Sequence, residues 1–372
     1  MRWIALLALL VAASACSDAT GLADAGLDAG TDADGAAGDD GDAATGDSGD
    51  SDALDGGDVQ ADGDAGPDGS GDDGLAGPDG GSDGDGALDG DGALDGDGAL
   101  DGDGAADGAG DQGSGCAFSV LTINLKHPLL GMEDALQRLQ MVADGILASQ
   151  PDAVALQEVI RDGDSPCFAE QLAGLTGYEW YWEFTFTVPF SFDEGIGILS
   201  RHPIVWHDSA ELPHLDLVMF RRRVLGGRVD SPCGPIQLFC THMTTDSDEQ
   251  VKADQALAVY EFIRANPSEA PGFMAGDLNA EPDTLAMRFF RGEAEHEGTR
   301  GDLRDAWLET MPGEDGFTIH SNNPERRIDY IYIVSGSSGT ASAESCELMY
   351  TEPRDGLYAS DHLGVLCRFM IR

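Results

Sequence analysis

Hydrophobic residues recur at two different spacings along the last two thirds of this 372-residue chain. In residues 131–150 and 247–266 they return every three or four positions, which places them on one face of an α-helix. Ser247 or Asp248 is a suitable N-cap for the second helix. The expected buried faces consist of Met132, Leu136, Leu139, Val142, Ala143, Ile146 and Leu147 in the first helix and of Val251, Leu257, Tyr260 and Ile263 in the second.

Seven short runs rich in β-branched and aromatic residues lie before, between and after these two stretches. Several runs are apolar at successive positions, which is typical of strands that are buried on both faces. Strands that alternate with amphipathic helices predict an α/β domain. The spacing alone does not distinguish an open sheet covered by helices from two sheets packed face to face. The runs span residues 118–125, 153–159, 195–201, 235–243, 272–277, 328–334 and 364–371.

The first 115 residues differ in composition from the rest of the chain. They contain 29 of the 69 acidic residues, all of them Asp, and a single basic residue, Arg2. From residue 17 onward they consist mainly of Asp, Gly, Ala and Ser, so they have little apolar surface to bury and are expected to be disordered. GALDGD repeats three times over residues 86–103, and its six-residue period does not match the nine-residue calcium-binding repeat. We therefore interpret residues 16–115 as an acidic, disordered tether.

Residues 1–15 have the features of a secretion signal, with Arg2 followed by an apolar run and small residues. The apolar run is too short to cross a bilayer as a helix. Residues 13–16, ASAC, resemble a bacterial lipobox, in which Cys16 is acylated and becomes the first residue of the mature protein. Ordinary cleavage after Ala15 is the alternative. We expect an exported lipoprotein, anchored through Cys16 at the outer membrane or the cell surface.

The seven cysteines fit an oxidising compartment. Six remain besides Cys16, and six cysteines allow up to three disulfides in 15 different pairings. Their spacing contains no CxxC pair and no Cys/His cluster of the kind that binds zinc. Cys240 has apolar neighbours that would raise the pKa of its thiol, so we interpret it as a structural residue and not as a nucleophile.

Residues that carry chemistry stand at the ends of the apolar runs. In the last hundred residues they form three clusters: GDLN with Asp277 and Asn279, RRIDY with Asp329, and SDH with Asp361 and His362. Successive side chains of a strand point to opposite faces, so Asp277 and Asn279 point the same way. Carboxylates, an amide and an imidazole gathered at one edge of a sheet are what a metal ion and a scissile phosphate require. The sequence therefore predicts an enzyme.

Four further residues of this kind, Asn124, Glu158, Glu194 and His242, end or begin runs upstream. In chain order the motifs read N, QE, EGxxILSR, TH, GDxN, RIDY and SDH. This series resembles the endonuclease/exonuclease/phosphatase superfamily, which includes DNase I-like nucleases, bacterial sphingomyelinases and inositol-polyphosphate phosphatases. The resemblance covers residues 118–372. It implies that residues 116–372 form a catalytic domain of four layers, with two mixed β-sheets packed face to face between outer helices.

The resemblance also implies a phosphoester hydrolase, most readily a phosphodiesterase, that uses Mg²⁺ or Mn²⁺. Glu158 would be a metal ligand, Asn124 would lie beside it, and Asp361 would approach the metal. His242, with Glu194 as its partner, would stabilise the charge that develops on the phosphate or protonate the leaving oxygen.

The remaining motif residues would act on the attacking water and the phosphate. Asp277 would orient or deprotonate the water, and Asn279 would bind a phosphate oxygen. His362 is the expected general acid or base, because an imidazole titrates near neutral pH. Asp329 would hold its tautomer, as carboxylates do beside other catalytic imidazoles.

The charge of the domain bears on its substrate. After residue 115 there are 40 acidic and 19 basic side chains, a net charge of −21 with histidine neutral, and the only lysines are Lys126 and Lys252. The one dense basic run, Arg221–Arg223, either contacts a substrate phosphate or forms a solvated strand face. Duplex nucleic acids bind mainly through several Lys and Arg side chains, so we expect a phosphoester bound without a long polyanion track.

The substrate class stays open among a lipid head group, a sugar phosphate and a nucleic acid. We expect a monomer that is held at a bacterial membrane through its lipid. The alternatives are a secreted DNase-like endonuclease and a non-catalytic binding or surface protein that uses the same fold. The complete acid, amide and imidazole set argues against the second alternative.

Overall fold

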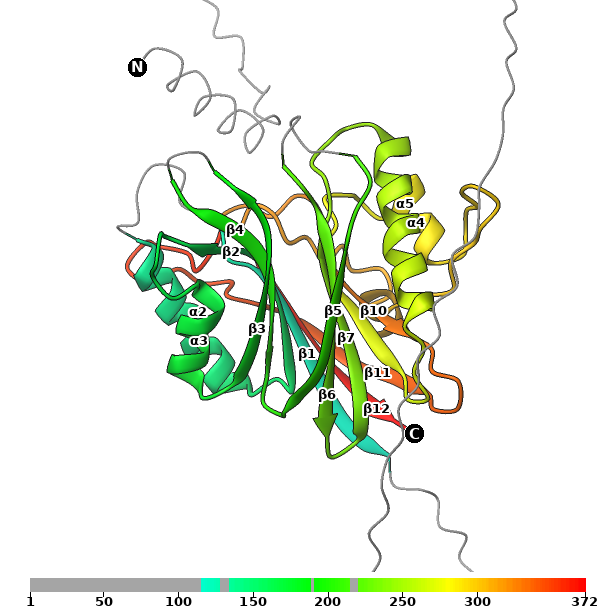
Figure 1. The fold of residues 1–372 in the computed structure, drawn as a ribbon, viewed down its shortest axis with the longest axis horizontal. Helices are drawn as coiled ribbons and strands as arrows, with labels where there is room; N and C mark the ends of the chain where they lie inside the picture. Colours follow the sequence, from blue (N-terminus) through cyan, green and yellow to red (C-terminus); the bar gives the residue numbers. More distant parts are fainter. Residues whose placement is uncertain (1–114, 128–133, 189–190, 215–219) are drawn as a thin grey trace, which may run out of the picture. The chain divides into compact units, whose positions relative to one another are not determined.

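Two six-stranded β-sheets pack face to face in the computed structural model, and helices cover the outer face of each sheet (Figure 1). The structure describes residues 115–372 apart from 128–133, 189–190 and 215–219. The four-layer fold that the motifs imply is thus confirmed. The predicted signal, Cys16, the acidic tether and Met132 lie outside the described residues. Within the described part of the chain, no helix has the length and apolar character needed to cross a membrane.

The first sheet has the strand order β11-β12-β1-β2-β4-β3. Strands β1 and β2 run parallel, and the other neighbours run antiparallel. Helices α2 (Ala135–Ser149) and α3 (Phe168–Thr176) pack on its outer face. The strands are β1 (Cys116–Asn124), β2 (Ala153–Arg161), β3 (Glu179–Thr187), β4 (Asp193–Ser200), β11 (Ala341–Met349) and β12 (Gly364–Ile371).

The second sheet has the strand order β5-β6-β7-β8-β10-β9 and one parallel pair, β7 and β8. Helices α4 (Glu249–Ala265) and α5 (Leu285–Phe290) cover its outer face, and the short helix α6 (Ala306–Thr310) directly follows β9. The strands are β5 (Ile204–Glu211), β6 (Arg223–Ser231), β7 (Gly234–His242), β8 (Gly272–Asp277), β9 (Arg304–Asp305) and β10 (Asp329–Val334).

The core consists of three apolar layers, one between the sheets and one beneath each pair of helices. Between the sheets, the ring of Phe273 lies 5.7 Å from that of Phe118 and 4.3 Å from that of Phe369, measured between centroids. A fully buried side chain of this size stabilises the fold by roughly 1.5–3 kcal/mol. Because both sheets bury both faces, their central strands show the continuous apolar runs seen in the sequence.

Both predicted helices form, but the predicted face of the first is partly wrong. Leu136 and Leu147 of α2 are 61% and 47% exposed. Arg138 is buried instead, and its guanidinium donates hydrogen bonds to the carbonyl oxygens of Leu125 and Lys126. Backbone acceptors at the end of β1 thus bring a charged residue into a position that an apolar pattern does not predict. The correctly placed residues of this face are Leu139, Val142, Ala143 and Ile146.

Helix α4 begins as predicted. Asp248 is the N-cap, and its carboxylate accepts a hydrogen bond from the backbone N–H of Gln250 at 2.9 Å. Tyr260 and Ile263 are buried against the second sheet. Val251 and Leu257 are only partly buried, because they lie at the margins of the packed face.

Two disulfides form, fewer than the three that six cysteines allow. Cys167 and Cys240 keep free thiols in the core. Burial raises the pKa of the Cys240 thiol to about 12, so at neutral pH it is an unreactive apolar group. The bonded pairs are Cys116–Cys233 and Cys346–Cys367.

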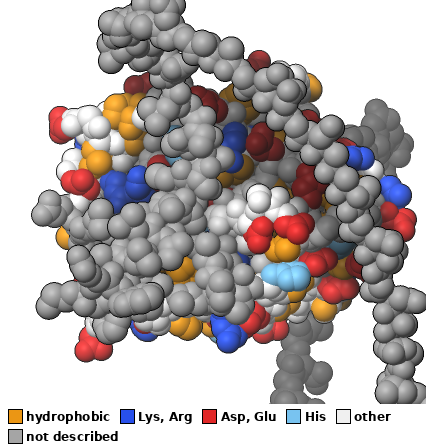
Figure 2. All heavy atoms as spheres, turned by 90° about the horizontal axis from the view of Figure 1, so that it is seen from above, with side chains coloured by type: hydrophobic (Ala, Val, Ile, Leu, Met, Phe, Trp, Pro, Cys, Tyr) orange, Lys and Arg blue, Asp and Glu red, His pale blue; other side chains and the backbone are white. Residues whose placement is uncertain are grey.

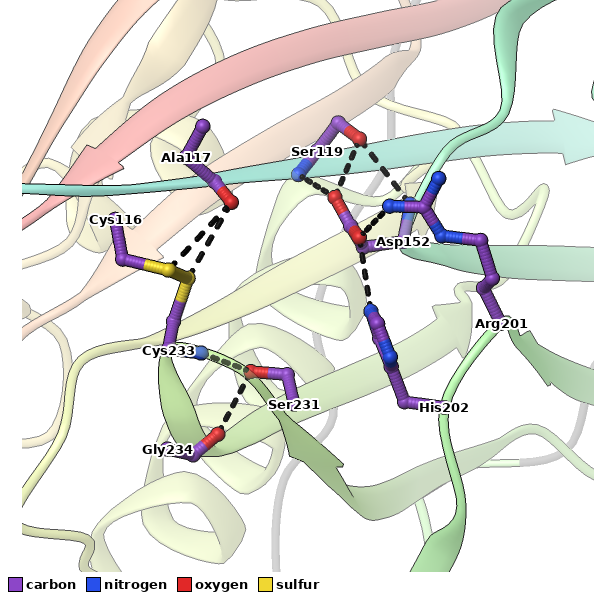
Figure 3. Close-up of a disulfide and its surroundings, with 9 residues drawn as sticks. All are labelled: Cys116, Ala117, Ser119, Asp152, Arg201, His202, Ser231, Cys233 and Gly234. Carbon is purple, nitrogen blue, oxygen red and sulfur yellow. Dashed lines mark hydrogen bonds and ion pairs between the residues drawn. A yellow bond between two sulfur atoms is a disulfide. The ribbon is translucent and has the colours of Figure 1, made fainter.

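A cluster of hydrogen bonds closes the end of the first sheet at which β1 and β2 begin (Figure 3). The carboxylate of Asp152 accepts bonds from the backbone N–H and the hydroxyl of Ser119, both at 2.8 Å. It also binds His202 through Nε2 at 2.9 Å and the guanidinium of Arg201. Asp152 precedes β2, and Arg201 follows β4, so one side chain ties three strands together.

Candidate active site

The register of the strands brings the predicted residues to the other end of the sandwich. Strands β1 and β2 run parallel, with Asn124 at the end of β1 and Glu158 near the end of β2. In the second sheet, Asp277 is paired with His242 of β7 on one side and with Asp329 of β10 on the other. Side chains far apart in the sequence therefore meet at one edge.

Gly276 allows β7 and β8 to approach closely just before this edge. Its φ is 156°, and a Cβ at this position would lie 2.0 Å from the carbonyl oxygen of Thr241. No other residue fits without moving one of the strands. The next residues along these strands are His242 and Asp277, whose Nε2 and Oδ2 atoms lie 3.5 Å apart.

The carboxylate of Asp277 lies between two imidazoles. Its Oδ2 is 3.5 Å from Nε2 of His242 and 3.8 Å from Nε2 of His362, and it accepts a hydrogen bond from Nδ2 of Asn124 at 3.0 Å. Asp277 is 1% exposed. Burial and the neighbouring charge of Asp329 raise its pKa to about 7. This carboxyl group can therefore gain or lose a proton near neutral pH.

Asp329 holds the second imidazole in place. Its Oδ2 lies 2.9 Å from Nδ1 of His362, so Nε2 faces Asp277. Burial lowers the pKa of His362, but the charges of Asp329 and Asp277 raise it to about 10. The backbone N–H of Asp329 donates to the hydroxyl of Thr318, a residue that the motifs did not include. Among the described residues, the buried Oδ1 of Asp329 has no hydrogen-bond partner.

Glu158 is held by donors on both of its oxygens. Oε1 accepts a hydrogen bond from Nδ2 of Asn124 at 3.0 Å. Oε2 accepts one from the backbone N–H of His127 at 2.6 Å and lies 2.5 Å from Nδ1 of the same residue. The amide oxygen of Asn124 accepts from the backbone N–H of Lys126 at 2.9 Å, so in this structure Asn124 orients Glu158 and Asp277 through its N–H groups.

Three residues of this edge have backbone angles that side chains rarely adopt. The φ angles are 57° for Lys126, 53° for Glu158 and 48° for Asn279. Such conformations cost about 1–3 kcal/mol each and persist where the surrounding structure imposes them, frequently at functional sites. In Glu158 the angle coincides with an irregularity in the pairing of β2 with β4.

Glu194 contacts His127, and Asp361 contacts Lys126. Oε2 of Glu194 lies 3.2 Å from Nδ1 of His127. The pairing of Glu194 with His242, which the family resemblance implies, stays a prediction. Oδ2 of Asp361 lies 3.3 Å from Nζ of Lys126, and its side chain is 34% exposed. The sequence analysis did not include either cation among the site residues, and their only signal was a position two and three residues after Asn124.

Asn279 lies beside Asp277 in the same loop. Its backbone N–H donates to Oδ1 of Asp277 at 2.9 Å, and its Nδ2 donates to the carbonyl oxygen of Met243 at 3.0 Å. Its carbonyl oxygen accepts a bond from Nζ of Lys252. An amide nitrogen carries two N–H groups, so the bond to Met243 is compatible with a second one to a phosphate oxygen.

The donor set at this edge fits a hard divalent cation. Glu158, Asp277, Asp329 and Asp361 supply carboxylate oxygens, the ligands that Mg²⁺ prefers, and Oδ1 of Asp329 is buried without a partner among the described residues. One atom each of Asp277, Asp329 and His362 also lie within 4.8 Å of one another. His362 and Asp329 of this group already share a hydrogen bond, and the ligands that the motifs predict, Glu158 and Asp361, lie outside it.

The arginine run is engaged with carboxylates. Arg221 lies 2.5 Å from Glu211, and Arg223 lies 3.0 Å from Glu183. Arg222 is 7% exposed. On the face drawn in Figure 2, acidic side chains are interspersed with the basic ones, and no continuous basic surface is visible among the described residues. The run therefore does not form an open patch for a polyanion.

Comparisons with known proteins show the family and the fold of the chain. A sequence profile of the endonuclease/exonuclease/phosphatase family matches residues 121–362. A candidate neutral sphingomyelinase from Caenorhabditis elegans is 26% identical over 297 residues, which make up 68% of this chain and 66% of that protein. The match thus spans just under two thirds of that relative's length.

Solved structures show the same fold. A family member from Beutenbergia cavernae DSM 12333 has a TM-score of 0.54 and 23% identity, over 68% of this chain and 71% of that chain. D. rerio TDP2 in complex with a single-strand DNA product has a TM-score of 0.53 and 22% identity, over 68% and 98% of the two chains. Motifs, fold and family profile coincide, and the chain belongs to the endonuclease/exonuclease/phosphatase family of phosphoester hydrolases.

Proposed function

We propose that this chain is a divalent-metal-dependent phosphodiesterase. The observation that supports this most directly is the Asp277 carboxylate, which lies within 3.8 Å of Nε2 of both His242 and His362. The Asp277 carboxyl group, with a pKa of about 7, can act as a base, and the two imidazoles beside it can act as acids. Hydrolysis of a phosphodiester requires this combination, because one proton leaves the attacking water and another reaches the leaving oxygen.

The cation would be held by Glu158 and Asp361. When bound, Mg²⁺ or Mn²⁺ screens the phosphate charge and lowers the pKa of a bound water. Asn124 keeps Glu158 in position through its amide N–H, and the same amide fixes Asp277. Asn124 would therefore set the spacing between the cation ligand Glu158 and the proton acceptor Asp277.

The proton transfers would fall to the residues of β7, β8 and β10. Asp277 takes the proton of the attacking water, and Asn279 binds a phosphate oxygen. His362 is positively charged at neutral pH, because its pKa is about 10, and Asp329 keeps its Nε2–H directed into the site. His242 provides the second imidazole on the far side of Asp277, where it stabilises the developing charge or protonates the leaving oxygen.

We propose a compact phosphodiester, such as a phospholipid head group, as the substrate. The domain has a net charge of −21, and Arg221 and Arg223 are paired with carboxylates, which weakens binding of a long polyanion. The sphingomyelinase-like relative favours a lipid substrate, whereas the DNA-bound relative keeps a nuclease as the second candidate. The nuclease would show a high KM and weak sequence preference.

We further propose that the protein is exported and held at a membrane as a monomer through a lipid on Cys16. The support is the ASAC sequence after the apolar run of residues 3–13. Stable anchoring requires more than one acyl chain. Mass spectrometry of the purified protein should show acylated Cys16, and Cys16→Ala should abolish membrane association. A native protein without lipid would contradict the anchor and leave the catalytic proposal intact.

A substrate panel tests the catalytic proposal. Bis-p-nitrophenyl phosphate, sphingomyelin vesicles, a phosphoinositide and duplex DNA should be compared with Mg²⁺, with Mn²⁺ and with chelator. We expect hydrolysis of the small diester, complete loss with chelator, and recovery when Mg²⁺ or Mn²⁺ is restored. Activity that persists in chelator would refute the metal requirement, and a preference for DNA at physiological salt would make the nuclease the primary function.

A further inference from the structure

The turn that follows β1 is held by three hydrogen bonds to the side chains of two residues, Asn124 and Arg138. Lys126 has a φ of 57°, and its backbone N–H donates to Oδ1 of Asn124 at 2.9 Å. Arg138 of α2 donates to the carbonyl oxygens of Leu125 at 3.5 Å and Lys126 at 3.2 Å. These bonds determine where the next residue, His127, enters the site. None of the seven motifs that carry the family resemblance includes His127.

His127 contacts two acidic residues of neighbouring strands. Its backbone N–H and its Nδ1 lie 2.6 and 2.5 Å from the same atom, Oε2 of Glu158. Nδ1 is also 3.2 Å from Oε2 of Glu194. The imidazole is 19% exposed and packs beside the ring of Phe192, with 5.7 Å between centroids. It thus bridges β2 and β4 at the point where Glu158 leaves the regular strand.

These contacts restrict what Glu158 can offer a cation. An ionised carboxylate has about four lone-pair directions, two on each oxygen. The backbone N–H of His127 donates to Oε2, its Nδ1 lies in ion-pair contact with the same oxygen, and Nδ2 of Asn124 occupies one direction of Oε1. One direction of Oε1 remains, so Glu158 can bind a cation through a single oxygen without losing a hydrogen bond.

We propose that His127 is a positioning residue that holds Glu158 as a one-oxygen ligand and thereby favours Mg²⁺ over Ca²⁺. The inference rests on the proposed metal-dependent function. Mg²⁺ keeps several waters and takes one or two carboxylates in near-octahedral geometry, whereas the larger Ca²⁺ accepts carboxylates through both oxygens. Loss of the imidazole removes the Nδ1 contact from Oε2, so that Glu158 can bind a cation through both of its oxygens.

Calorimetric titration of the full chain with Mg²⁺ alone and with Ca²⁺ alone tests this inference. His127→Ala should lower the Mg²⁺ affinity by about 10–100-fold, as loss of a bond to a metal ligand usually does. The Ca²⁺ affinity should stay level or rise. His127→Asn should restore the Mg²⁺ preference, because its Nδ2 donates from nearly the position of Nδ1. His207→Ala, at an exposed histidine of β5, is the matched control.

The outcomes separate the inference from the function on which it rests. Wild-type affinities for both ions in His127→Ala would overturn the role of His127. An equal loss for both ions, without rescue by His127→Asn, would show general loosening of the site and would also overturn it. A wild-type protein that binds neither ion would refute the proposed metal dependence itself, and the inference with it.

Discussion

Two buried aspartates at opposite ends of the sandwich differ in how their charge is balanced. Asp152, where β1 and β2 begin, accepts hydrogen bonds from the backbone and hydroxyl of Ser119 and from His202 and Arg201 (Figure 3). Burial raises the pKa of Asp152, but the bonds from His202, Ser119 and Arg201 bring it below the usual value. This carboxylate is saturated with donors and stays charged.

Asp277, at the other end, has fewer and weaker partners. Its bonds come from a neutral amide of Asn124 and the backbone of Asn279, while the imidazoles lie 3.5 and 3.8 Å away. Burial and the charge of Asp329 raise its pKa to about 7.

The difference separates a structural carboxylate from a reactive one. Full hydrogen bonding lowers the free energy of the charged form and ties strands together, whereas incomplete neutralisation keeps a proton exchangeable near neutral pH. Both ends combine aspartate with histidine, so residue types alone do not identify the active site. The number and charge of the donors around each carboxylate do.

The largest effect on catalysis should come from His362→Ala. Loss of a positioned general acid or base lowers turnover by at least ~10²-fold. Turnover of bis-p-nitrophenyl phosphate at saturating Mg²⁺ measures this effect. His202→Ala, which removes the imidazole on the other aspartate, should keep wild-type turnover. Equal turnover in the two variants would remove the distinction between the two ends.

A smaller effect, on stability, should come from Asp152→Asn. The substitution weakens hydrogen bonds to a charged, buried group, which is worth about 1–3 kcal/mol. We expect a correspondingly lower free energy of unfolding by urea titration, with unchanged turnover per folded molecule. An unaltered midpoint would show that the cluster around Asp152 contributes nothing to the fold.

The smallest effect concerns pH, and its sign differs between the two residues. The pKa of Asp152 is lowered, so its contribution to stability is present above the unfolded value of about 3.9 and is lost as pH falls through the lower native value. Asp277, with a native pKa of about 7, keeps a proton that the unfolded chain has lost above about pH 4. The contribution of Asp277 to stability is therefore present below about pH 4 and is lost as the pH rises to about 7.

Thermal unfolding across this range checks the signs. Between about pH 4 and about pH 7, the Tm of Asp277→Asn should rise relative to wild type, because the variant lacks the titrating group. The Tm of Asp152→Asn should be lower than that of wild type at neutral pH and approach it in acid. Parallel plots of Tm against pH for wild type, Asp277→Asn and Asp152→Asn would contradict the pKa shifts given for both aspartates.

The apolar runs predicted most of the central strands, because strands buried on both faces have continuous apolar sequences. The edge strands were missed, and so was β6, an inner strand of the second sheet. Strand β11 alternates small and polar residues and strand β5 contains His207 and Asp208, since one side of each faces solvent. Leu136 and Leu147 were placed on the wrong side of α2 because tertiary hydrogen bonds buried Arg138 in their stead.

The site residues that lie at strand ends were predictable from the sequence. Asp277, Asp329 and His242 follow from register, because paired strands bring their terminal residues to one edge. Lys126 and His127 did not follow, since their contacts depend on a left-handed turn that the sequence pattern does not reveal. For the same reason the sequence did not reveal that Arg221 and Arg223 pair with carboxylates of other strands, Glu211 and Glu183.

The most direct test of the catalytic role of Asp277 is the turnover of Asp277→Asn beside that of Asp152→Asn, measured per folded molecule on bis-p-nitrophenyl phosphate with saturating Mg²⁺. We predict that Asp277→Asn loses at least ~10²-fold in kcat with a Tm at neutral pH no lower than that of wild type. Asp152→Asn should show the reverse, a lower Tm with wild-type kcat. Wild-type kcat in Asp277→Asn would contradict the assignment of the catalytic centre to the ends of β7, β8 and β10.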